Sequence, residues 1–493
     1  MNQNVKVREE VLSSIWKNQS FNKNIKTIDG SQVEIYNIGV ENVEYGGPDF
    51  SNAKIRIGNL VFVGDVELDT SVTDWKAHGH NLDKKYNRVI IQISLFNKEH
   101  IPNVYSKDGR KIPTVCLSEY IEKSRLEELI IQINRKTAGS ANKIKCSNYL
   151  QNTDVNLQSE FVKKLGVERL RKKCDRMFFR LKELAFVREL NLKEPVIRYD
   201  LNQSFISRVF SYQDFQEIEL WQQLFYESLF EALGYSKNKK NMIHLTQAVN
   251  INVIKKYSER EDLLDVINTL LIKVAGFLND GYTKLDDSDQ DYLNKLEEKW
   301  NEIKNDYDGR MFDNSLWNFA KLRPQNFPTI RVAGGTVLIH KIIKENFIEL
   351  LLNKITAIHK PETLINALRS AFIVKADGYW KNHYTVGESS NTSLKFFVGG
   401  MRADDIIVNV VIPFFSVYFE VFGKQDLAKK ILVVYSTIIQ REDNSIVKNI
   451  SEMLNMRDSW KKSIYSQGML ELFRNYCSRD KCLECEIGKK AFN

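Results

Sequence analysis

The sequence predicts an α+β domain at the N-terminus followed by a larger, mostly α-helical domain. Short stretches of alternating apolar residues, separated by turn residues, run through the first quarter of the chain. From about Ser118 onward, apolar residues instead recur at helical spacing. Pro102 and Pro113 punctuate the transition. We therefore expect an α+β domain at 1–125, a helical domain at 126–475 and a cysteine-rich tail at 476–493.

The first domain is expected to follow the order helix, three strands, helix, strand. Val11, Leu12, Ile15 and Trp16 lie at helical spacing and predict a helix from residue 8 to about residue 19. A second helix, carrying Trp75, His78, Leu82 and Tyr86 at helical spacing, is expected after a Thr73–Asp74 cap. The four strands of this order are expected at 33–38, 53–57, 60–69 and 89–95, and a further short strand is expected at 114–117.

Composition limits the class of protein. The chain has 493 residues, of which 43% are hydrophobic, so ordinary buried cores are possible. Its net charge of +8 permits a nucleic-acid partner without demonstrating one. No apolar stretch reaches the roughly 18 residues that a membrane span requires, and the nearest, 406–422, contains Asn409, Pro413 and Glu420. We see no signal peptide and expect a soluble cytoplasmic protein.

Acidic residues flank the second and third strands. A Gly58–Asn59 turn predicts a tight hairpin, which would bring Asp49 close to Glu67 and Asp69. Residues two apart on a strand face the same side, so Asp65, Glu67 and Asp69 share one face. Gathered carboxylates suit a hard divalent cation such as Mg²⁺ or Mn²⁺. The alternative interpretation is that these are solvated acids at a strand end.

His78 and His80 lie near the acidic strand end in sequence. Either histidine could act as an acid or base, or bind a metal ion. Residues two apart on a helix do not face each other, so binding one ion together would require a local break at Gly79. The alternative is a structural histidine packed beside Trp75.

The element order and the acids of the first domain resemble the restriction-endonuclease-like superfamily. Its nucleases carry Pro-Asp followed by Asp/Glu-x-Lys, to which Pro48–Asp49 and Glu67 correspond. Gln92 resembles a glutamine of the exonuclease branch, and Glu9 or Glu10 would match an acid on the first helix. The resemblance implies Mg²⁺-dependent cleavage of nucleic acid by Asp49, Glu67, Asp69 and Gln92, with His78 or His80.

One position departs from that pattern. Asp69 stands where the superfamily has lysine, whose ammonium group orients the attacking water and stabilises developing charge. Lys54, Lys76 or His78 could replace it from a neighbouring element. Without such a replacement, the domain would be a binding scaffold that kept the fold and lost the chemistry.

A second resemblance covers nearly the whole chain. Segments throughout it are similar to the bacterial family labelled Domain of Unknown Function 2851; they are 47–50, 64–67, 74–80, 86–90, 232–238, 323–328, 379–380, 409–413 and the cysteine tail. Members of that family tend to have Glu-x-His at 67–69 and histidine at position 92, where this chain has Asp69 and Gln92. The resemblance implies no mechanism.

The C-terminal tail contains three closely spaced cysteines. Cys477, Cys482 and Cys485 form a C-x4-C-x2-C pattern, and thiolates at such spacing can hold Zn²⁺ or an iron–sulfur cluster. A fourth ligand could be Cys146, Cys174, Cys116 or a histidine. The alternative is three reduced, partly buried thiols. We expect a metal that joins the C-terminus to the body of the protein.

A strongly basic segment at 163–188 predicts a helix with one apolar stripe and one positive face. That face could run along phosphates, or simply be solvated. The leading hypothesis is thus a Mg²⁺-dependent nuclease that acts on DNA or RNA. The alternative is a non-catalytic scaffold that binds nucleic acid or protein.

Overall fold

The computed structural model describes residues 9–42, 47–130, 145–190, 205, 207–278, 285–319, 322–390, 392–441, 444–456 and 460–492. The chain divides into two compact units. The first comprises Met1–Lys143 with Asn318–Leu322, and the second comprises Ile144–Trp317 with Arg323–Asn493.

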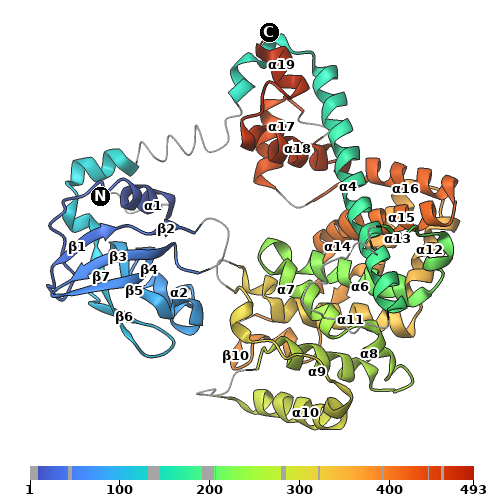
Figure 1. The fold of residues 1–493 in the computed structure, drawn as a ribbon, viewed down its shortest axis with the longest axis horizontal. Helices are drawn as coiled ribbons and strands as arrows, with labels where there is room; N and C mark the ends of the chain where they lie inside the picture. Colours follow the sequence, from blue (N-terminus) through green and yellow to red (C-terminus); the bar gives the residue numbers. More distant parts are fainter. Residues whose placement is uncertain are drawn as a thin grey trace. The chain divides into compact units, whose positions relative to one another are not determined.

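The first unit is built on a mixed β-sheet, drawn in blue in Figure 1. Its strand order is β1-β3-β4-β5-β7-β6, with β2 paired to β3. The β3–β4 pair is antiparallel, whereas β4–β5 and β5–β7 are parallel. The strands are β1 (Val33–Asn37), β2 (Val40–Glu41), β3 (Phe50–Ile57), β4 (Leu60–Ser71), β5 (Val89–Phe96), β6 (Asn103–Tyr105) and β7 (Lys111–Cys116). The predicted α+β character of the N-terminal region is confirmed.

Helix α1 (Glu9–Lys17) packs against this sheet as its apolar spacing predicts. The side chains of Val11 and Trp16 are fully buried, in one hydrophobic cluster with Val66 and Leu68 of β4. Because strand residues alternate between faces, burying Val66 and Leu68 under α1 sends the acids of β4 to the opposite face. The core thereby determines which face carries the acidic residues.

The prediction of one continuous helix after β4 is wrong. Helix α2 (Asp74–Ala77) lasts one turn and is followed by 3₁₀ turns at His80–Leu82 and Lys84–Arg88. Gly79 interrupts the helix with a φ of +74°, a backbone conformation that favours glycine. Thr73 is at the N-cap but makes no side-chain cap hydrogen bond. Strands β2 and β6 were not predicted, because two or three residues are too few to show alternation.

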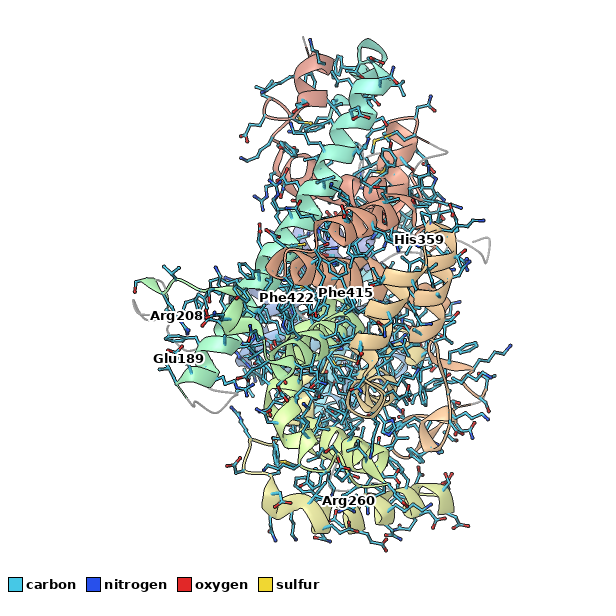
Figure 2. The ribbon with its side chains drawn as sticks, turned by 90° about the vertical axis from the view of Figure 1, so that its right-hand side faces the viewer. Glu189, Arg208, Arg260, His359, Phe415 and Phe422 are labelled. Carbon is cyan, nitrogen blue, oxygen red and sulfur yellow. The ribbon has the colours of Figure 1, made fainter. Side chains whose placement is uncertain are left out.

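The second unit is mostly helical, as predicted. Phe415 and Phe422 lie among its packed helices (Figure 2). Its helices include α4 (Val155–Glu189), α6 (Ile218–Leu233), α7 (Tyr235–Ala248), α10 (Asp287–Ile303), α14 (Gly400–Ile406), α15 (Ile412–Val421), α17 (Ser445–Met453), α18 (Ser463–Asn475) and α19 (Glu486–Phe492). The other long helices are α9 (Leu263–Ala275), α11 (Pro328–Lys344), α12 (Phe347–Ala357), α13 (Pro361–Phe372) and α16 (Gln425–Thr437).

Helices α4 and α18 cross at two glycines. A Cβ atom added at Gly166 would overlap the carbonyl oxygen of Ile464, and one added at Gly468 would overlap that of Val162. The backbones can therefore approach this closely only because both positions lack a side chain. The crossing places the basic face of α4 beside α18.

The apolar segment at 406–422 is part of the core of this unit. A π-helix (Ile407–Val411) joins α14 to α15, and its Ile407, Val408 and Val411 are completely buried. Throughout the described residues, every helix is too short or too polar to cross a bilayer.

Candidate metal centre

Strand β4 presents its three acids on one buried face of the sheet. Asp65 is 7% exposed, and Glu67 and Asp69 are each 1% exposed. Carboxylates are rarely buried to this degree unless they are paired, hydrogen-bonded or bound to a metal. The partners of each acid therefore show what it does.

The hairpin brings Asp49 to Glu67, as the Gly58–Asn59 turn predicts. The Asp49 backbone N–H donates to Glu67 Oε2 at 3.0 Å, and the Leu68 N–H donates to Asp49 Oδ2 at 3.0 Å. These reciprocal hydrogen bonds hold the start of β3 against the middle of β4. Asp49 thus lies beside Glu67.

Asp65 has a different partner. The β3–β4 register shifts between Phe50 and Ala53, where Asn52 has a φ of +58°. Asp65 Oδ1 accepts a hydrogen bond from the Asn52 N–H at 3.1 Å. The carboxylate of Asp65 therefore accepts a backbone N–H of the strand irregularity. Asp65 lies two residues before Glu67 on β4.

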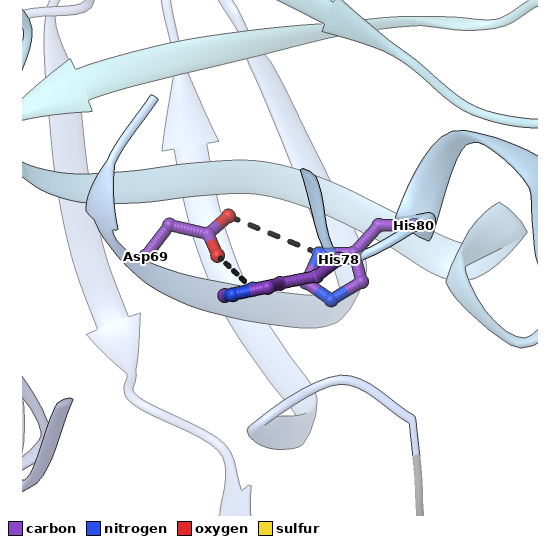
Figure 3. Close-up of side chains that lie close together, drawn as sticks. All are labelled: Asp69, His78 and His80. Atoms are coloured by element: carbon purple, nitrogen blue, oxygen red, sulfur yellow. Dashed lines mark ion pairs between the residues drawn. The ribbon is translucent and has the colours of Figure 1, made fainter. Parts of the chain in front are cut away.

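Asp69, His78 and His80 converge at the end of the acidic face (Figure 3). Asp69 Oδ1 lies 3.5 Å from His78 Nδ1, and Asp69 Oδ2 lies 3.9 Å from His80 Nδ1. One ligand atom from each of the three residues falls within 4.8 Å of the others. The left-handed Gly79 turns the chain between the two histidines, so both reach the same carboxylate. This is the local break that a shared ion requires.

Glu67 joins the group through His80. Its Oε1 atom lies 3.5 Å from His80 Nε2. His80 is completely buried, whereas the His78 side chain is 31% exposed. The group therefore combines an enclosed side, formed by Glu67 and His80, with a side open to solvent at His78.

Aromatic rings hold His80 in place. The Tyr86 ring stacks on His80 with centroids 4.1 Å apart, and Trp75 meets its edge at 5.3 Å. Trp75 is itself anchored, since its indole N–H donates to the Tyr105 carbonyl at 2.9 Å. Burial, and next the negative charge of Glu67, raise the pKa of Tyr86, so its phenol stays protonated. Trp75 thus packs beside a histidine as the structural interpretation expects, and the same histidine faces both acids.

Gln92 lies beside Glu67 on the neighbouring parallel strand. Its side-chain amide N–H donates to Asp69 Oδ2 at 2.6 Å and to the Val72 carbonyl at 3.3 Å. Burial raises the pKa of Asp69, while hydrogen bonds from His78 and Gln92 oppose this shift. Gln92 therefore orients Asp69 and stabilises its charge.

The residues named as possible substitutes for the motif lysine are placed differently. Lys54 is an exposed residue of β3 opposite Val63, and Lys76 is exposed on α2. Within the described part of the chain, neither makes an ion pair or hydrogen bond with Glu67 or Asp69. His78 is the one of the three that reaches Asp69. The side chains of Glu9 and Glu10 lie outside the described residues.

The comparisons with known proteins identify the family. The family model described as Protein of unknown function (DUF2851) matches residues 9–191 and 207–445, which is most of the chain. The chain belongs to the DUF2851 family. No curated protein and no solved structure shows a match. The DUF2851 match contains every residue of the candidate centre but ends before the C-terminal cysteines.

Cys146, at the start of the second unit, lies near the three cysteines of the C-terminal tail in this DUF2851 protein. Cys146 and Cys485 are buried in one hydrophobic cluster, and Cys477 packs against it. Burial, with smaller contributions from the nearby Cys485 and Cys482, raises the pKa of Cys146 to about 11. The same causes raise the pKa of Cys477 to about 12. Cys146 is therefore the fourth-ligand candidate that lies near the cysteines of the tail.

Local contacts explain why Cys146 lies there. Lys145 Nζ forms an ion pair with Asp480 at 3.0 Å, and the Tyr149 ring contacts Phe492 at 5.3 Å. The other proposed donors have different neighbours. Cys116 lies in the first unit beside the Leu95 carbonyl, and the Cys174 thiol faces the Pro413 carbonyl.

The second unit contains another carboxylate–histidine group, which the sequence did not predict. It is formed by Asp286, Asp289 and His383. Asp286 and Asp289 accept each other's backbone N–H in a capping box at the start of α10. Asp289 Oδ1 also accepts from the Tyr379 hydroxyl at 2.5 Å and the Gly387 N–H at 3.2 Å. These carboxylates are engaged by the protein itself, so the group serves the fold.

Proposed function

We propose that the first unit is a metal-dependent phosphodiesterase of restriction-endonuclease-like fold that cleaves nucleic acid. The observation that carries the proposal is the convergence of Glu67, Asp69, His78 and His80 at one buried strand end. Asp49 supports Glu67 through the hairpin, and Gln92 supports Asp69 from the neighbouring strand. Asp49, Glu67 and Gln92 correspond to positions that the superfamily resemblance implies, whereas Asp69 stands at the position of the motif lysine.

The donor set favours a transition-metal ion over Mg²⁺. Asp69, His78 and His80 bring one carboxylate and two imidazoles within 4.8 Å of one another, and Glu67 adds a second carboxylate 3.5 Å from the other ring nitrogen of His80. Imidazole is a ligand for Mn²⁺, Fe²⁺ or Zn²⁺ more than for Mg²⁺. A bound divalent ion would polarise a phosphate oxygen and lower the pKa of a bound water. Within this set, Glu67, Asp69 and His80 are the enclosed ligands.

His78 is suited to meet the substrate. It lies on the solvent-facing side of the group, and Asp69 orients its ring at 3.5 Å. A neutral imidazole in that position can accept a proton from an attacking water. We assign to His78 the water-orienting role that lysine performs in the related nucleases.

The test uses the full-length protein purified without chelator. Labelled single- and double-stranded DNA and RNA are incubated with Mn²⁺, Mg²⁺, Zn²⁺ or EDTA. We expect cleavage with Mn²⁺ that EDTA abolishes. Salt-sensitive binding without cleavage under any metal would instead support the scaffold hypothesis, which the absence of a lysine at position 69 favours.

The affinity of the centre for Mn²⁺ is expected to rise with pH. Burial raises the pKa of Asp69, so protons compete with the metal for this carboxylate at acidic pH and release it as pH rises. Calorimetric titrations with Mn²⁺ between about pH 5 and 8 measure the slope. Asp69→Asn should bind Mn²⁺ more weakly and show a shallower slope. A pH-independent affinity of the wild type would contradict the assignment of Asp69 as a ligand.

A further inference from the structure

A cavity of about 600 Å³ lies within the helical unit, among residues of α4, α6, α7, α17 and α18. Eight lysine or arginine side chains and three carboxylates line it. Every lining residue belongs to the second unit, so the cavity is complete without the first. A volume of this size accommodates a nucleotide-sized ligand.

The three carboxylates are already paired with some of the basic residues. Glu471 binds Arg169 at 3.1 Å and Lys172 at 2.6 Å. Glu231 binds Arg176 at 3.0 Å, and Asp405 binds Arg402 at 2.9 Å.

The other four basic residues have no carboxylate within ion-pair distance in the described part of the chain; they are Lys173, Lys239, Lys461 and Arg474. The cavity therefore carries positive charge that the protein does not neutralise. A recess with a net positive charge concentrates anions.

Lys173 shows this imbalance most clearly. Its ammonium group donates to Asn409 Oδ1 at 2.5 Å and to Gln467 Oε1 at 3.0 Å, both neutral amide oxygens. An ammonium group has three N–H donors, so one is left for a ligand. Burial, and then repulsion from Arg169, lower the pKa of Lys173 well below its ordinary value. An anion in the cavity would remove this electrostatic cost.

Two residues with unusual backbone geometry, Asn409 and Tyr235, line the same cavity. Asn409 lies in the π-helix at Ile407–Val411, an irregularity that is frequent at functional sites. Tyr235 has a φ of +50°, and its ring lies 3.6 Å below the guanidinium carbon of Arg402. Non-glycine residues in this conformation are strained by about 1–3 kcal/mol. Two separate departures from regular helix thus line one basic recess.

We propose that this cavity binds the phosphate groups of a nucleotide or of a single-stranded nucleic acid. Phosphate is negatively charged and would neutralise the basic residues that have no carboxylate partner. Arginine can bind phosphate with two parallel hydrogen bonds. Tyr235 and Trp460 also line the cavity and offer aromatic surface beside the charge. The site is separate from the metal centre and does not depend on the proposed nuclease activity.

The experiment measures binding of three probes to the full-length protein in EDTA, which prevents metal-dependent cleavage. The probes are inorganic pyrophosphate, ATP, and a fluorescent 20-nucleotide oligo(dT). We expect Lys173→Gln and Arg474→Gln each to weaken binding at least about tenfold, the effect of losing a hydrogen bond to a charged group. Lys163→Gln, an equal charge change at an exposed position of α4, should stay within about twofold of wild type.

The outcomes separate the possible sources of phosphate. Binding of ATP or pyrophosphate that competes with oligo(dT) indicates a nucleotide-sized site, whereas binding of oligo(dT) alone indicates a nucleic-acid strand. Arg474 is exposed, so its variant keeps the test valid if the Lys173 variant is unstable. No binding of any probe, or equal weakening by the Lys163 variant, would overturn the proposal.

Discussion

Glu67→Gln is expected to lower Mn²⁺-dependent cleavage by about 10³-fold, because a metal ligand supplies several kcal/mol of transition-state stabilisation. Glutamine keeps the size of the side chain, and its amide oxygen can still accept the Asp49 N–H that glutamate holds at 3.0 Å. The hairpin should therefore survive, while the negative charge beside His80 is lost. Initial rates on the best substrate, with Mn²⁺ affinity measured by calorimetry, check both effects.

Asp65→Asn is the matched control for Glu67→Gln. Asp65 shares the strand and the buried face, but its carboxylate accepts the Asn52 N–H, and asparagine can accept the same hydrogen bond. This variant should retain cleavage within a few-fold of wild type. Equal rates for wild type and Glu67→Gln at saturating Mn²⁺ would remove Glu67 from the centre. An equal loss in both variants would show that any charge removed from β4 disturbs the domain.

Cys146→Ser is expected to abolish metal binding at the C-terminus. We propose that Cys146, Cys477, Cys482 and Cys485 together hold Zn²⁺ or an iron–sulfur cluster, since the first, second and fourth share one hydrophobic cluster and Cys482 is near enough to act electrostatically on Cys477. A thiolate-bound zinc contributes about 10 kcal/mol or more to the folding of small domains, so its loss should free the tail from the segment around Cys146. Protection of α19 against hydrogen exchange should fall accordingly.

Elemental analysis and the visible absorption spectrum of anaerobically purified protein decide this prediction. One zinc per chain without colour indicates a four-thiolate zinc site, and a broad visible band with iron and sulfide indicates a cluster. Cys174→Ser, which alters a thiol facing Pro413, should leave the metal content unchanged. Wild-type protein without zinc or iron, or Cys146→Ser with full metal content, would contradict the four-thiolate site.

The sequence predicted what depends on neighbours in the chain. The hairpin follows from the Gly58–Asn59 turn, and the shared face of Glu67 and Asp69 follows from the two-residue period of a strand. Helix α1 follows from its apolar spacing. The need for a break at Gly79 also follows from helix geometry. The continuous helix was nevertheless predicted wrongly, because helical apolar spacing continues across 3₁₀ turns and conceals where they begin.

The sequence could not show which side chains meet across distant elements. Tyr86 stacks on His80 only because the chain turns at Gly79, and Gln92 reaches Asp69 only because β5 pairs with β4 in parallel. Cys146 is separated from Cys485 by most of the second unit, so no spacing pattern could single it out. The charge of the cavity is likewise a sum over segments far apart in sequence.

The sequence by itself determined that an α+β region precedes a mostly helical one, and it determined the family and the acidic strand, because turn chemistry and side-chain period are local properties. Tertiary structure alone decided that two histidines join Glu67 and Asp69, that Cys146 joins the tail, and that cations collect around Lys173. These sites consist of close approaches between groups remote in the chain. Their energies depend on distance and burial, and packing sets both.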